Sequence, residues 1–232
     1  MPSSRRRGRR YDATVTQPSA RLRSALVGAG ARLGARGLIA AGEGNLSLRL
    51  PDGRILITPS GRRKDQLDPE DLVVVSMDAE TPSGSRAAGP RPSSDLAIHR
   101  AVYAARPDVS AIVHAHVPAA MALTVAGEAP DPALLPETAL FLPRLPVVPY
   151  GEPGSAELAA RIAAALAEPP LPLAGAAILE RHGAIAVGVG SAEGTDAAPE
   201  GALAQALDRM ELVDVLCRVW RDALVLRAAR GR

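Results

Sequence analysis

The segment from residue 45 to residue 58 carries the pattern of a β-hairpin, and this pattern restricts the fold more than any other part of the chain. Residues 45–50 read Asn-Leu-Ser-Leu-Arg-Leu, residues 51–53 read Pro-Asp-Gly, and residues 54–58 resume an apolar run. Strict alternation is typical of a half-buried strand, and Pro-Asp-Gly is a turn sequence. The segment therefore predicts two neighbouring antiparallel strands, which favours an antiparallel sheet covered by helices.

The rest of the chain alternates between helical spacing and short apolar runs, without an internal repeat or a clear domain boundary. A single α+β domain is therefore expected from residue 19 to residue 232. The Pro-, Gly- and Ser-rich residues 79–92 predict an exposed, mobile loop. The predicted helices span residues 19–36, 93–105 and 118–125, a segment opened by Gly154-Ser155, and about 200–226; the predicted strands span residues 72–77, 110–116, 145–148, 176–180 and 184–189.

The composition excludes several classes of protein. With 232 residues and 47% hydrophobic content, the chain can build one domain with a substantial core. Aromatic residues make up only 2%, so the core depends on aliphatic side chains, and platforms for stacking nucleic-acid bases are scarce. No apolar stretch reaches the length of a membrane span, and none follows the N-terminal arginines as in a secretory signal. We expect a cytoplasmic protein with neither a nucleic acid nor a membrane as partner.

Positive charge is concentrated at the N-terminus. The formal net charge is +2, and five arginines fall within the first ten residues: Arg5, Arg6, Arg7, Arg9 and Arg10. The rest of the chain is therefore close to neutral or acidic. Such a cluster can contact nucleic acid or an acidic surface, but we interpret residues 1–18 as a disordered, solvated tail. The single cysteine, Cys217, lies in an apolar helical stretch and is interpreted as a small buried hydrophobic residue.

Three of the four histidines indicate a divalent-metal site. His114 and His116 lie two apart in a predicted strand, so both imidazoles point to the same face and can bind one ion. A third ligand from a distant segment, His182, would leave positions on the metal open for substrate. The alternative is that these are ordinary half-buried histidines. His99 is interpreted as a structural or supporting residue, because the ligand set is complete without it.

Six short phrases in a fixed order carry a family resemblance. They resemble the class II aldolase/adducin family over residues 19–226, whose enzymes include fuculose-1-phosphate aldolase, rhamnulose-1-phosphate aldolase and ribulose-5-phosphate 4-epimerase. The resemblance implies a three-layer α/β/α fold around a mostly antiparallel sheet, and a homotetramer with active sites at subunit junctions. The phrases are Gly42-Glu43-Gly44-Asn45-Leu46-Ser47, Ile57-Thr58-Pro59-Ser60-Gly61, Pro92-Ser93-Ser94-Asp95, His114-Ala115-His116, Pro149-Tyr150-Gly151-Glu152-Pro153-Gly154-Ser155 and His182-Gly183.

The same resemblance implies roles for individual residues. It assigns a catalytic Zn²⁺ to His114, His116 and His182, although imidazole also suits manganese, cobalt or iron. Hydroxyls, an amide and glycine-exposed backbone N–H groups form a reasonable neutral cradle for an anion. The alternative for the glycines is that they only form tight turns. The residues that the resemblance assigns to the substrate phosphate are Asn45, Ser60, Gly61, Ser93 and Ser94.

Asp95 follows the serine pair and is the predicted catalytic residue. In the family's aldolases this position usually holds a glutamate, which acts as acid and base and also contacts the metal. Aspartate is one methylene shorter, and a group that moves a proton must come within hydrogen-bonding distance of it. The epimerase branch typically carries Ser-Ser-Asp, so Asp95 is a point in favour of that branch. An alternative role for Asp95 is to cap the following helix, which does not exclude catalysis.

The resemblance is incomplete at the proton donors. The family's aldolases use one tyrosine after the H-x-H strand and one near the C-terminus, and this chain has neither. The epimerase branch uses an acidic residue after the strand, where this chain offers only Glu137, and a C-terminal tyrosine. No tyrosine follows Tyr150. Tyr150 is therefore a candidate donor, and its alternative role is packing at a turn.

These residues predict a metal-dependent aldolase similar to fuculose-1-phosphate aldolase. It would cleave a carbon–carbon bond in a phosphorylated ketose through a metal-stabilised enediolate. In the reverse direction it would form that bond by joining the enediolate to an aldehyde substrate. The alternatives within the family are a ribulose-5-phosphate 4-epimerase and a keto-acid decarboxylase, which need the same enolate stabilisation. An alternative from another class is a non-catalytic, adducin-like interaction module, although such modules lose the histidines that this chain retains.

Overall fold

A seven-stranded sheet with the order β3-β2-β1-β4-β7-β6-β5 forms the centre of the molecule. The computed structural model describes residues 17–78, 89–190 and 197–231. Neighbouring strands pair antiparallel except β5 and β6, which run parallel. The strands are β1 (Asn45–Arg49), β2 (Ile55–Ile57), β3 (Val73–Val75), β4 (Val109–Ala115), β5 (Val147–Val148), β6 (Ala176–Leu179) and β7 (Gly183–Val189).

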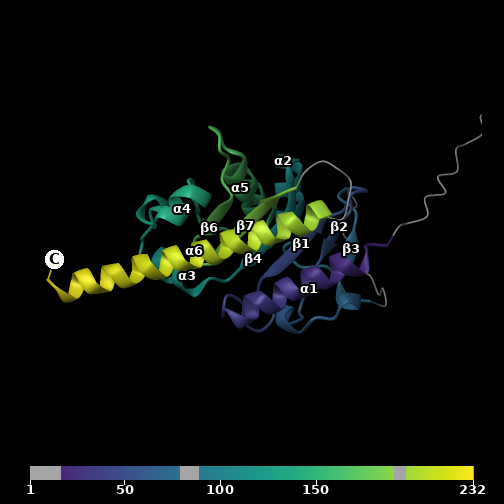
Figure 1. Cartoon of the computed structure of the whole chain (residues 1–232), viewed down its shortest axis with the longest axis horizontal. Coiled ribbons are helices and arrows are strands. Elements are labelled where there is room, and N and C mark those ends of the chain that lie inside the picture. Colours follow the sequence, from purple (N-terminus) through teal and green to yellow (C-terminus); the bar gives the residue numbers. More distant parts are fainter. Residues whose placement is uncertain (1–16, 79–88, 191–196, 232) are drawn as a thin grey trace, which may run out of the picture.

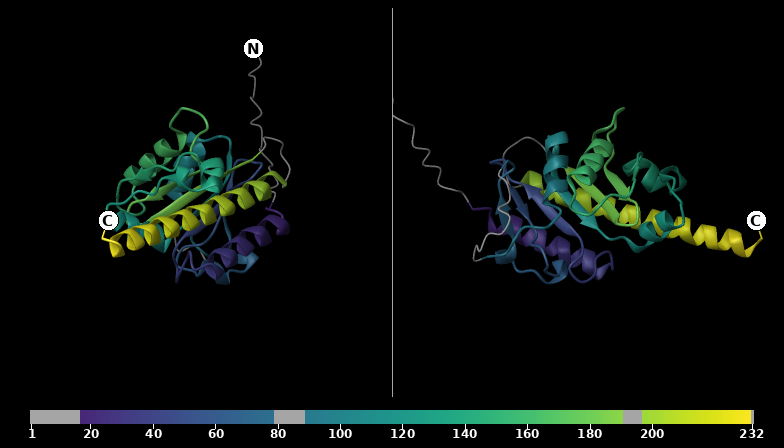
Figure 2. Two further views of the ribbon diagram at one scale, coloured as in Figure 1. Left: turned by 60° about the vertical axis from the view of Figure 1, so that its left-hand side comes forward. Right: turned by 180° about the vertical axis from the view of Figure 1, so that it is seen from behind.

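Helices cover both faces of this sheet (Figures 1 and 2). Apolar side chains of α1, α3 and α6 pack on one face, and those of α2 and α5 pack on the other. The predicted three-layer α/β/α fold with a mostly antiparallel sheet is therefore confirmed. The α-helices are α1 (Ala20–Ala35), α2 (Leu96–Ala105), α3 (Pro118–Val125), α4 (Pro136–Phe141), α5 (Ala156–Ala167) and α6 (Ala197–Ala229); short 3₁₀ helices are η1 (Lys64–Gln66), η2 (Pro69–Asp71) and η3 (Pro132–Leu134).

The predicted hairpin is confirmed as β1 and β2. Ser47 pairs with Ile57 and Arg49 with Ile55, and Gly53 in the connecting turn has a φ of 82°. Leu46 contributes to the core on the α1/α6 side of the sheet, whereas Ser47 contacts α2 on the other side. The period-two alternation of the sequence therefore appears as two faces of one strand, as pleated geometry requires.

Two helices begin at the serines that the sequence suggests. The Oγ of Ser19 accepts a hydrogen bond from the Leu22 N–H at 3.3 Å, and the Oγ of Ser155 accepts one from the Leu158 N–H at 3.1 Å. Each bond satisfies a backbone donor that the first helical turn leaves without a partner. Cys217 is fully buried, and burial raises the pKa of its thiol to about 12, as expected for a packing residue.

Several boundaries differ from the predictions. β3 is shorter than predicted, α6 is longer, and β4 ends one residue before His116. The sequence did not predict α4, because its segment is rich in proline, although Pro136 at the first helical position is compatible with a helix start. The predicted tail at residues 1–18 and the loop at residues 79–92 fall mostly outside the described residues.

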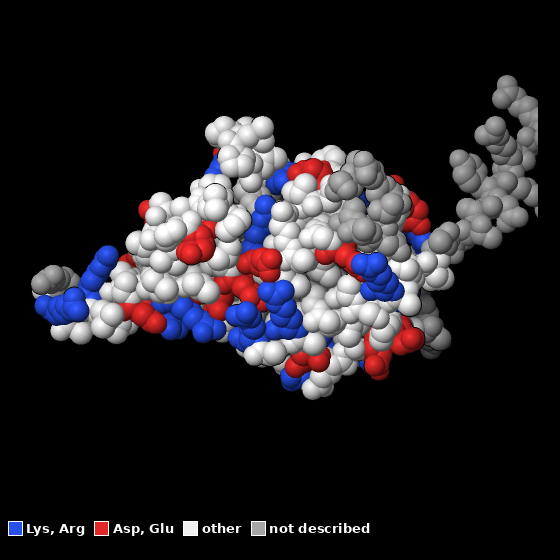
Figure 3. All heavy atoms as spheres, in the orientation of Figure 1, with Lys and Arg blue, Asp and Glu red and all other residues white. Residues whose placement is uncertain are grey.

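The long helix α6 packs across β4 and β7 and also contacts α1 and α3 (Figure 1). Acidic and basic side chains are interspersed on the face that α1 and α6 present in Figure 3. Between the two helices, Glu211 of α6 pairs with Arg32 at 2.5 Å and with Arg36 at 2.7 Å. Within the described ranges, no helix has both the length and the apolar character needed to cross a bilayer.

Candidate active site

Three histidines from two distant segments meet beside the central strands. His114 lies near the end of β4, His116 follows its last residue, and His182 lies in the turn between β6 and β7. Their ring centroids are 4.8, 4.9 and 5.1 Å apart. One ring nitrogen from each lies within 4.8 Å of the others. The structure therefore brings the predicted ligand set together.

The turn that carries His182 packs so closely against β4 that a side chain after it would not fit. Gly183 has a φ of 132°, and a Cβ there would lie 2.2 Å from the Ala115 carbonyl oxygen and 2.8 Å from the His116 Cα. Arg181, on the other side of His182, has a φ of 58°, a left-handed conformation that is uncommon outside glycine. In the His-Gly phrase, the histidine is the ligand, and the glycine lets the backbone come close enough to β4 to place that ligand there.

The hydrogen bonds of the imidazoles leave two nitrogens for a ligand. His114 Nδ1 lies 2.9 Å from the Ala184 carbonyl oxygen, so it carries the ring proton and donates it there. The Nε2 of His114 and the Nδ1 of His182 are buried without a hydrogen-bond partner among the described residues. Such atoms are costly to leave unpaired, and a divalent ion would satisfy both. The three residues therefore fit a divalent metal ion, and imidazole is a favourable ligand for zinc.

Burial lowers the pKa of all three imidazoles. The pKa of His114 falls to about 3, first through burial and then through the charge of His182. Burial is also the largest cause of the lowered pKa of His116 and of His182. Because metals bind the neutral imidazole, these histidines need lose no proton to bind an ion at neutral pH.

Glu43 is a further polar residue at this site, and no sequence pattern predicted a role for it. Its Oε1 lies 3.6 Å from the Nδ1 of His116, and its Oε2 accepts a hydrogen bond from the Ala40 N–H at 3.1 Å. A carboxylate beside the second ring nitrogen commonly orients a metal-binding histidine. Glu43 is therefore placed to orient the His116 ring.

Asp95 lies at the start of α2, next to the histidines. Its Oδ2 is 4.0 Å from the unpaired Nε2 of His114, and the residue is 8% exposed. The alternative that its side chain caps α2 is wrong, because that side chain makes no capping hydrogen bond. Instead, Oδ2 accepts a hydrogen bond from Asn45 Nδ2 at 2.7 Å. This bond directs the carboxylate toward the histidines instead of its own helix.

A short backbone bridge brings the predicted phosphate-binding turns together. Pro59 and Pro92 form an isolated antiparallel bridge, in which the Ser60 N–H donates to the Arg91 carbonyl at 2.9 Å and the Ser93 N–H donates to the Thr58 carbonyl at 3.2 Å. The turn with Ser60 and Gly61 therefore lies beside the turn with Ser93 and Ser94. Of the four, Ser93 is buried and the other three are exposed.

Asn45 is placed differently from the other predicted phosphate-binding residues. It pairs with His114 across β1 and β4, and its side chain lies between Asp95 and His99. Its oxygen lies 2.6 Å from His99 Nε2, and one of its two N–H groups is donated to Asp95. Only the other N–H of the amide therefore remains for an anion. The position of Asn45 therefore indicates that its main role is to bond to Asp95.

Lys64 is a buried cation near the predicted phosphate-binding turns. Its ammonium donates to the carbonyl oxygens of Gly42 at 2.6 Å and Arg62 at 2.8 Å, and the residue is 2% exposed. Burial lowers the pKa of Lys64, whereas the charge of Asp95 raises it. Buried charges are normally paired, yet no ion pair within the described part of the chain includes Lys64. No local sequence pattern indicates this burial, so Lys64 is a site residue that the sequence does not predict.

We expect the Lys64→Met protein to bind inorganic phosphate about 10- to 100-fold more weakly than the wild type, because one charge-assisted contact is lost. Isothermal titration with inorganic phosphate measures the change. Arg63→Met is the matched control, since Arg63 is half exposed and pairs with Asp65 at 2.8 Å. Equal phosphate affinity for Lys64→Met and wild type would contradict a role for Lys64 in anion binding.

The buried His99 makes stability depend on pH. Burial lowers its pKa from 6.5 to about 4, an effect that the charge of Asp95 only partly opposes. The unfolded chain therefore binds a proton below pH 6.5 that the folded chain does not bind until about pH 4. The stabilising contribution of the neutral His99 ring to the folded state is fully present above pH 6.5 and is lost as the pH falls toward 4.

From this shift, we expect the free energy of unfolding to fall by roughly 2 kcal/mol between pH 6 and pH 4.5 on account of His99 alone. Urea unfolding at the two pH values measures the total change. In His99→Gln, which has no titrating ring, the change should be smaller by that amount. The same pH dependence in wild type and variant would show that His99 titrates normally in the folded protein.

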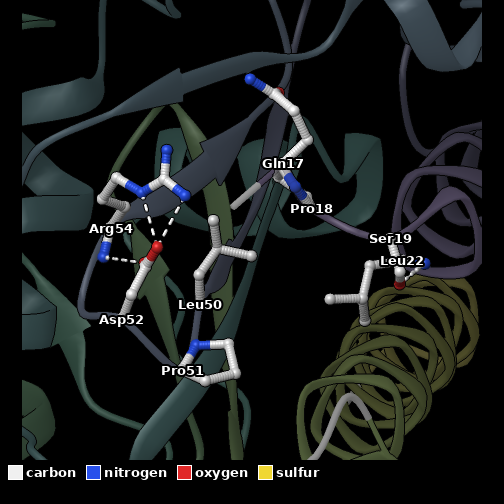
Figure 4. Close-up of a pocket in the computed structure, with 8 residues that line it drawn as sticks. All are labelled: Gln17, Pro18, Ser19, Leu22, Leu50, Pro51, Asp52 and Arg54. Atoms are coloured by element: carbon white, nitrogen blue, oxygen red, sulfur yellow. Dashed lines mark hydrogen bonds and ion pairs between the residues drawn. The ribbon is translucent and has the colours of Figure 1, made fainter. Parts of the chain in front are cut away.

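The cavity shown in Figure 4 is separate from this site. It has a volume of about 320 Å³ and lies between the start of α1 and the β1–β2 turn. Its walls include Leu22 and Leu50, and at its edge Arg54 pairs with Asp52 at 2.6 Å. None of its lining residues is a predicted ligand, catalytic or phosphate-binding residue. The cavity therefore adds nothing to the chemistry of the histidine cluster.

Among the described residues, no hydrogen bond joins Tyr103 or Tyr150 to Asp95 or to the three histidines. Tyr103 is buried in the core between β1 and α2. The ring of Tyr150 is half exposed and lies under the guanidinium of Arg181, whose central carbon is 4.3 Å from the ring centroid. Tyr11 falls outside the described residues. Asp95 is therefore the acidic group closest to the unpaired nitrogen of His114 in the described ion pairs.

Together, the fold and the site define a class of protein. A three-layer α/β/α domain holds three neutral histidines as a divalent-metal site, and a carboxylate lies beside it. Metal sites of this type polarise carbonyl oxygens. The chain belongs to the Class II Aldolase and Adducin N-terminal domain family, whose model matches residues 24–221.

Known relatives include enzymes of different activities. The 3-oxo-tetronate 4-phosphate decarboxylase of Cupriavidus necator is 37% identical over 152 residues, which cover 64% of this chain and 67% of that protein. The methylthioribulose-1-phosphate dehydratase of Acidiphilium cryptum is 38% identical over 173 residues, which cover 70% and 78%. The crystal structure of L-fuculose-1-phosphate aldolase from Thermus thermophilus has a TM-score of 0.76 and 34% identity, covering 91% of this chain and 98% of that one.

Proposed function

We propose that the protein is a metal-dependent carbon–carbon lyase that decarboxylates a phosphorylated 3-oxo sugar acid. The observation that carries this proposal is the carboxylate of Asp95, whose Oδ2 lies 4.0 Å from the unpaired Nε2 of His114. The 37% identity with the Cupriavidus necator decarboxylase supports the same reaction. The substrate phosphate matches the hydroxyls of Ser60, Ser93 and Ser94 together with the N–H groups of Gly61 and Ser94, since the N–H groups of Ser60 and Ser93 already bond to backbone carbonyls.

Decarboxylation makes modest demands on the protein. The bond between the carboxylate carbon and its neighbour breaks, the electron pair moves toward the ketone oxygen, CO₂ leaves, and the neighbouring carbon then takes a proton. A divalent ion bound by the histidines supplies the positive charge that favours this movement of electrons. Asp95 is placed to pass this proton to the carbon, once it has taken the proton up from water. Aldol cleavage, by contrast, needs a base for a hydroxyl and an acid for the carbon.

The binding residues have a separate task in this proposal. Ser60, Gly61, Ser93 and Ser94 hold the substrate phosphate through hydroxyls and backbone N–H groups, and Lys64 adds a positive charge nearby. Glu43 keeps the His116 ring in one orientation. The phosphate then fixes the distance from the anchored end of the substrate to its reacting carbon, which confines the reaction to one bond.

Aldol cleavage of a phosphorylated ketose is the second candidate, and a specific observation favours it. The aldolase from Thermus thermophilus matches 91% of this chain with a TM-score of 0.76, a wider coverage than that of the decarboxylase. Asp95 would then act as both base and acid, as predicted from the sequence. A 4-epimerase would use the same cleavage followed by recombination of the two fragments.

A substrate panel distinguishes these activities. The zinc-loaded protein is incubated separately with a 3-oxo-tetronate 4-phosphate, fuculose 1-phosphate, ribulose 5-phosphate and methylthioribulose 1-phosphate. We expect CO₂ release from the oxo acid and slower or no release of aldehyde from the ketoses. Aldehyde release without CO₂ would select the aldolase, and a change of configuration without free aldehyde would select the epimerase. Loss of water from methylthioribulose 1-phosphate as the main reaction would contradict any carbon–carbon lyase.

The assembly belongs to the same proposal. The family resemblance implies a homotetramer with active sites at subunit junctions, and the exposed apolar residues Val215 and Val219 of α6 are suited to such packing. Sedimentation velocity at micromolar protein concentration measures the oligomeric state. A monomer with full activity would contradict active sites shared between subunits.

A further inference from the structure

A continuous chain of side-chain contacts runs from the core to Asp95. The Tyr103 hydroxyl lies 2.8 Å from Ser47 Oγ, which lies 2.7 Å from His99 Nδ1. His99 Nε2 lies 2.6 Å from Asn45 Oδ1, and Asn45 Nδ2 lies 2.7 Å from Asp95 Oδ2. These five residues are between 0% and 8% exposed. Water therefore has little access to the chain, and each link must be satisfied by its neighbours.

Local geometry explains how these residues line up. Asn45 and Ser47 are two apart on β1 and so share the face that α2 covers. Asp95, His99 and Tyr103 are spaced four apart, so they lie along one side of α2 and its first turn. The strand and the helix side therefore interleave, with Asn45 between Asp95 and His99 and Ser47 between His99 and Tyr103.

Tyr103, at the buried end of the chain, sets the direction of the first two hydrogen bonds. Burial raises the pKa of Tyr103 well above its ordinary value, so its hydroxyl keeps its proton. Among the described residues, Ser47 Oγ is its hydrogen-bond acceptor, so Tyr103 donates to Ser47. The Ser47 proton is then free to point at His99, and His99 Nδ1 accepts it.

The same logic continues to the carboxylate. Burial lowers the pKa of His99 to about 4, so the ring is neutral and holds a single proton. Because Nδ1 accepts from Ser47, that proton is on Nε2 and is donated to Asn45 Oδ1. The Asn45 amide is then fixed with its NH₂ toward Asp95 Oδ2. Every donor in the chain points toward Asp95.

We propose that His99 and Asn45 are positioning residues for Asp95: the one-way donor chain that starts at Tyr103 holds an N–H against Oδ2 and leaves Oδ1 to the substrate. No hydrogen bond reaches Oδ1 from the described residues, whereas Oδ2 faces both Asn45 and His114. The role of Oδ1 rests on the proposed function, but the direction of the chain does not.

The opposite direction is unfavourable at both ends. A proton on His99 Nδ1 would point at Ser47, and Ser47 would point at Tyr103, whose own proton would have no acceptor in the described structure. At the other end, Nε2 would need a donor, so the Asn45 amide would turn and place its oxygen against Asp95 Oδ2. Two acceptors would then meet in a buried place, which costs the desolvation of both.

Substitution of His99 tests the positioning role. Leucine removes the donor and keeps a buried apolar side chain, whereas the amide nitrogen of glutamine can replace Nε2. We expect His99→Leu to lower kcat on the substrate that the wild type turns over by roughly 10- to 100-fold, with KM and zinc affinity changed less than about twofold. His99→Gln should recover most of the kcat. Unchanged kcat in His99→Leu, or equal losses in both variants, would overturn the role.

The direction of the chain is tested on the wild type, without any need for activity. Histidine labelled with ¹⁵N reports which ring nitrogen carries the proton, and the signals missing from His99→Gln identify His99. We expect a neutral ring protonated on Nε2, at neutral pH and with zinc bound. A proton on Nδ1, or a charged ring, would overturn the proposed direction.

The two measurements separate this inference from the proposed function. If no substrate of the panel reacts but His99 carries its proton on Nε2, the proposed function fails and the direction of the chain stands. If a substrate reacts and His99→Leu retains the wild-type kcat, the function stands and the positioning role fails. A general loss of folding is recognised because it would lower zinc affinity together with kcat.

Discussion

Replacing His114 with alanine should reduce zinc affinity by at least about 100-fold, more than the loss usually caused by residues behind the ligands. The imidazole has its second nitrogen bonded to the Ala184 carbonyl at 2.9 Å, so its Nε2 is held in place for the ion. Alanine removes one of three ligand atoms that lie within 4.8 Å of one another. Activity should fall with the metal content and should not return when the substrate concentration is raised.

Zinc affinity is measured by competition with a chromogenic chelator, and metal content by mass spectrometry after dialysis. His99→Gln is the matched control, because His99 is also a buried histidine but lies on α2, outside the cluster. The control should keep its zinc. If His114→Ala and wild type bound zinc equally well, the assignment of the cluster as a metal site would be wrong.

Replacing Asp95 with asparagine should lower kcat by about 10²- to 10⁴-fold, the usual effect of losing a group that transfers a proton. The amide has nearly the same shape, and its oxygen can still accept the hydrogen bond from Asn45. It cannot, however, take up or deliver a proton at neutral pH. The expected loss is therefore chemical, with the fold and the position of the side chain retained.

The measurement is steady-state kinetics on the best substrate of the panel, with zinc content determined for the same samples. Asp208→Asn is a matched control, since Asp208 is an exposed acid of α6 that pairs with Arg32 at 3.0 Å. The control should retain the wild-type kcat. Full activity in Asp95→Asn would rule out proton transfer by Asp95 and direct attention to Tyr150 or to groups outside the described residues.

The fold was largely predictable because its signals are local. The alternation in residues 45–50 and the turn at residues 51–53 predicted β1 and β2, and the serine before each of α1 and α5 marked where those helices begin. The predicted helix and strand ends that are wrong lie where the local sequence pattern and the tertiary packing favour different limits. Helix α6 runs beyond both ends of its regular apolar repeat, and its packing against β4 and β7 is a long-range contact that the local pattern does not show.

The site was predictable in part. That His114 and His116 share a face follows from the two-residue period of a strand. The sequence could also place Asp95 after the serine pair, but it could not separate capping from catalysis, because both roles use the same residue at a helix start. Only the contact between Asp95 and Asn45 shows that the side chain turns away from the helix.

Three features of the site depend on contacts between distant segments. The burial of Lys64, the approach of Glu43 to His116, and the chain through His99 have no local sequence pattern. A lysine in a polar turn and a glutamate in a glycine-rich phrase are ordinarily solvated. Their roles arise because residues far apart in the chain enclose them.

By itself, the sequence determined the hairpin, the helix starts and the pairing of His114 with His116, since these follow from backbone periods and turn chemistry within a few residues. The family resemblance named His182 as the third ligand, but only the tertiary structure shows how it reaches that pair and what holds Asp95. His182 arrives through the β6–β7 turn, whose Gly183 allows contact with β4, and Asn45 faces His114 only because β1 and β4 pair in that register. Register and close backbone approach are long-range properties, because many residues far apart in the chain must pack together to fix them.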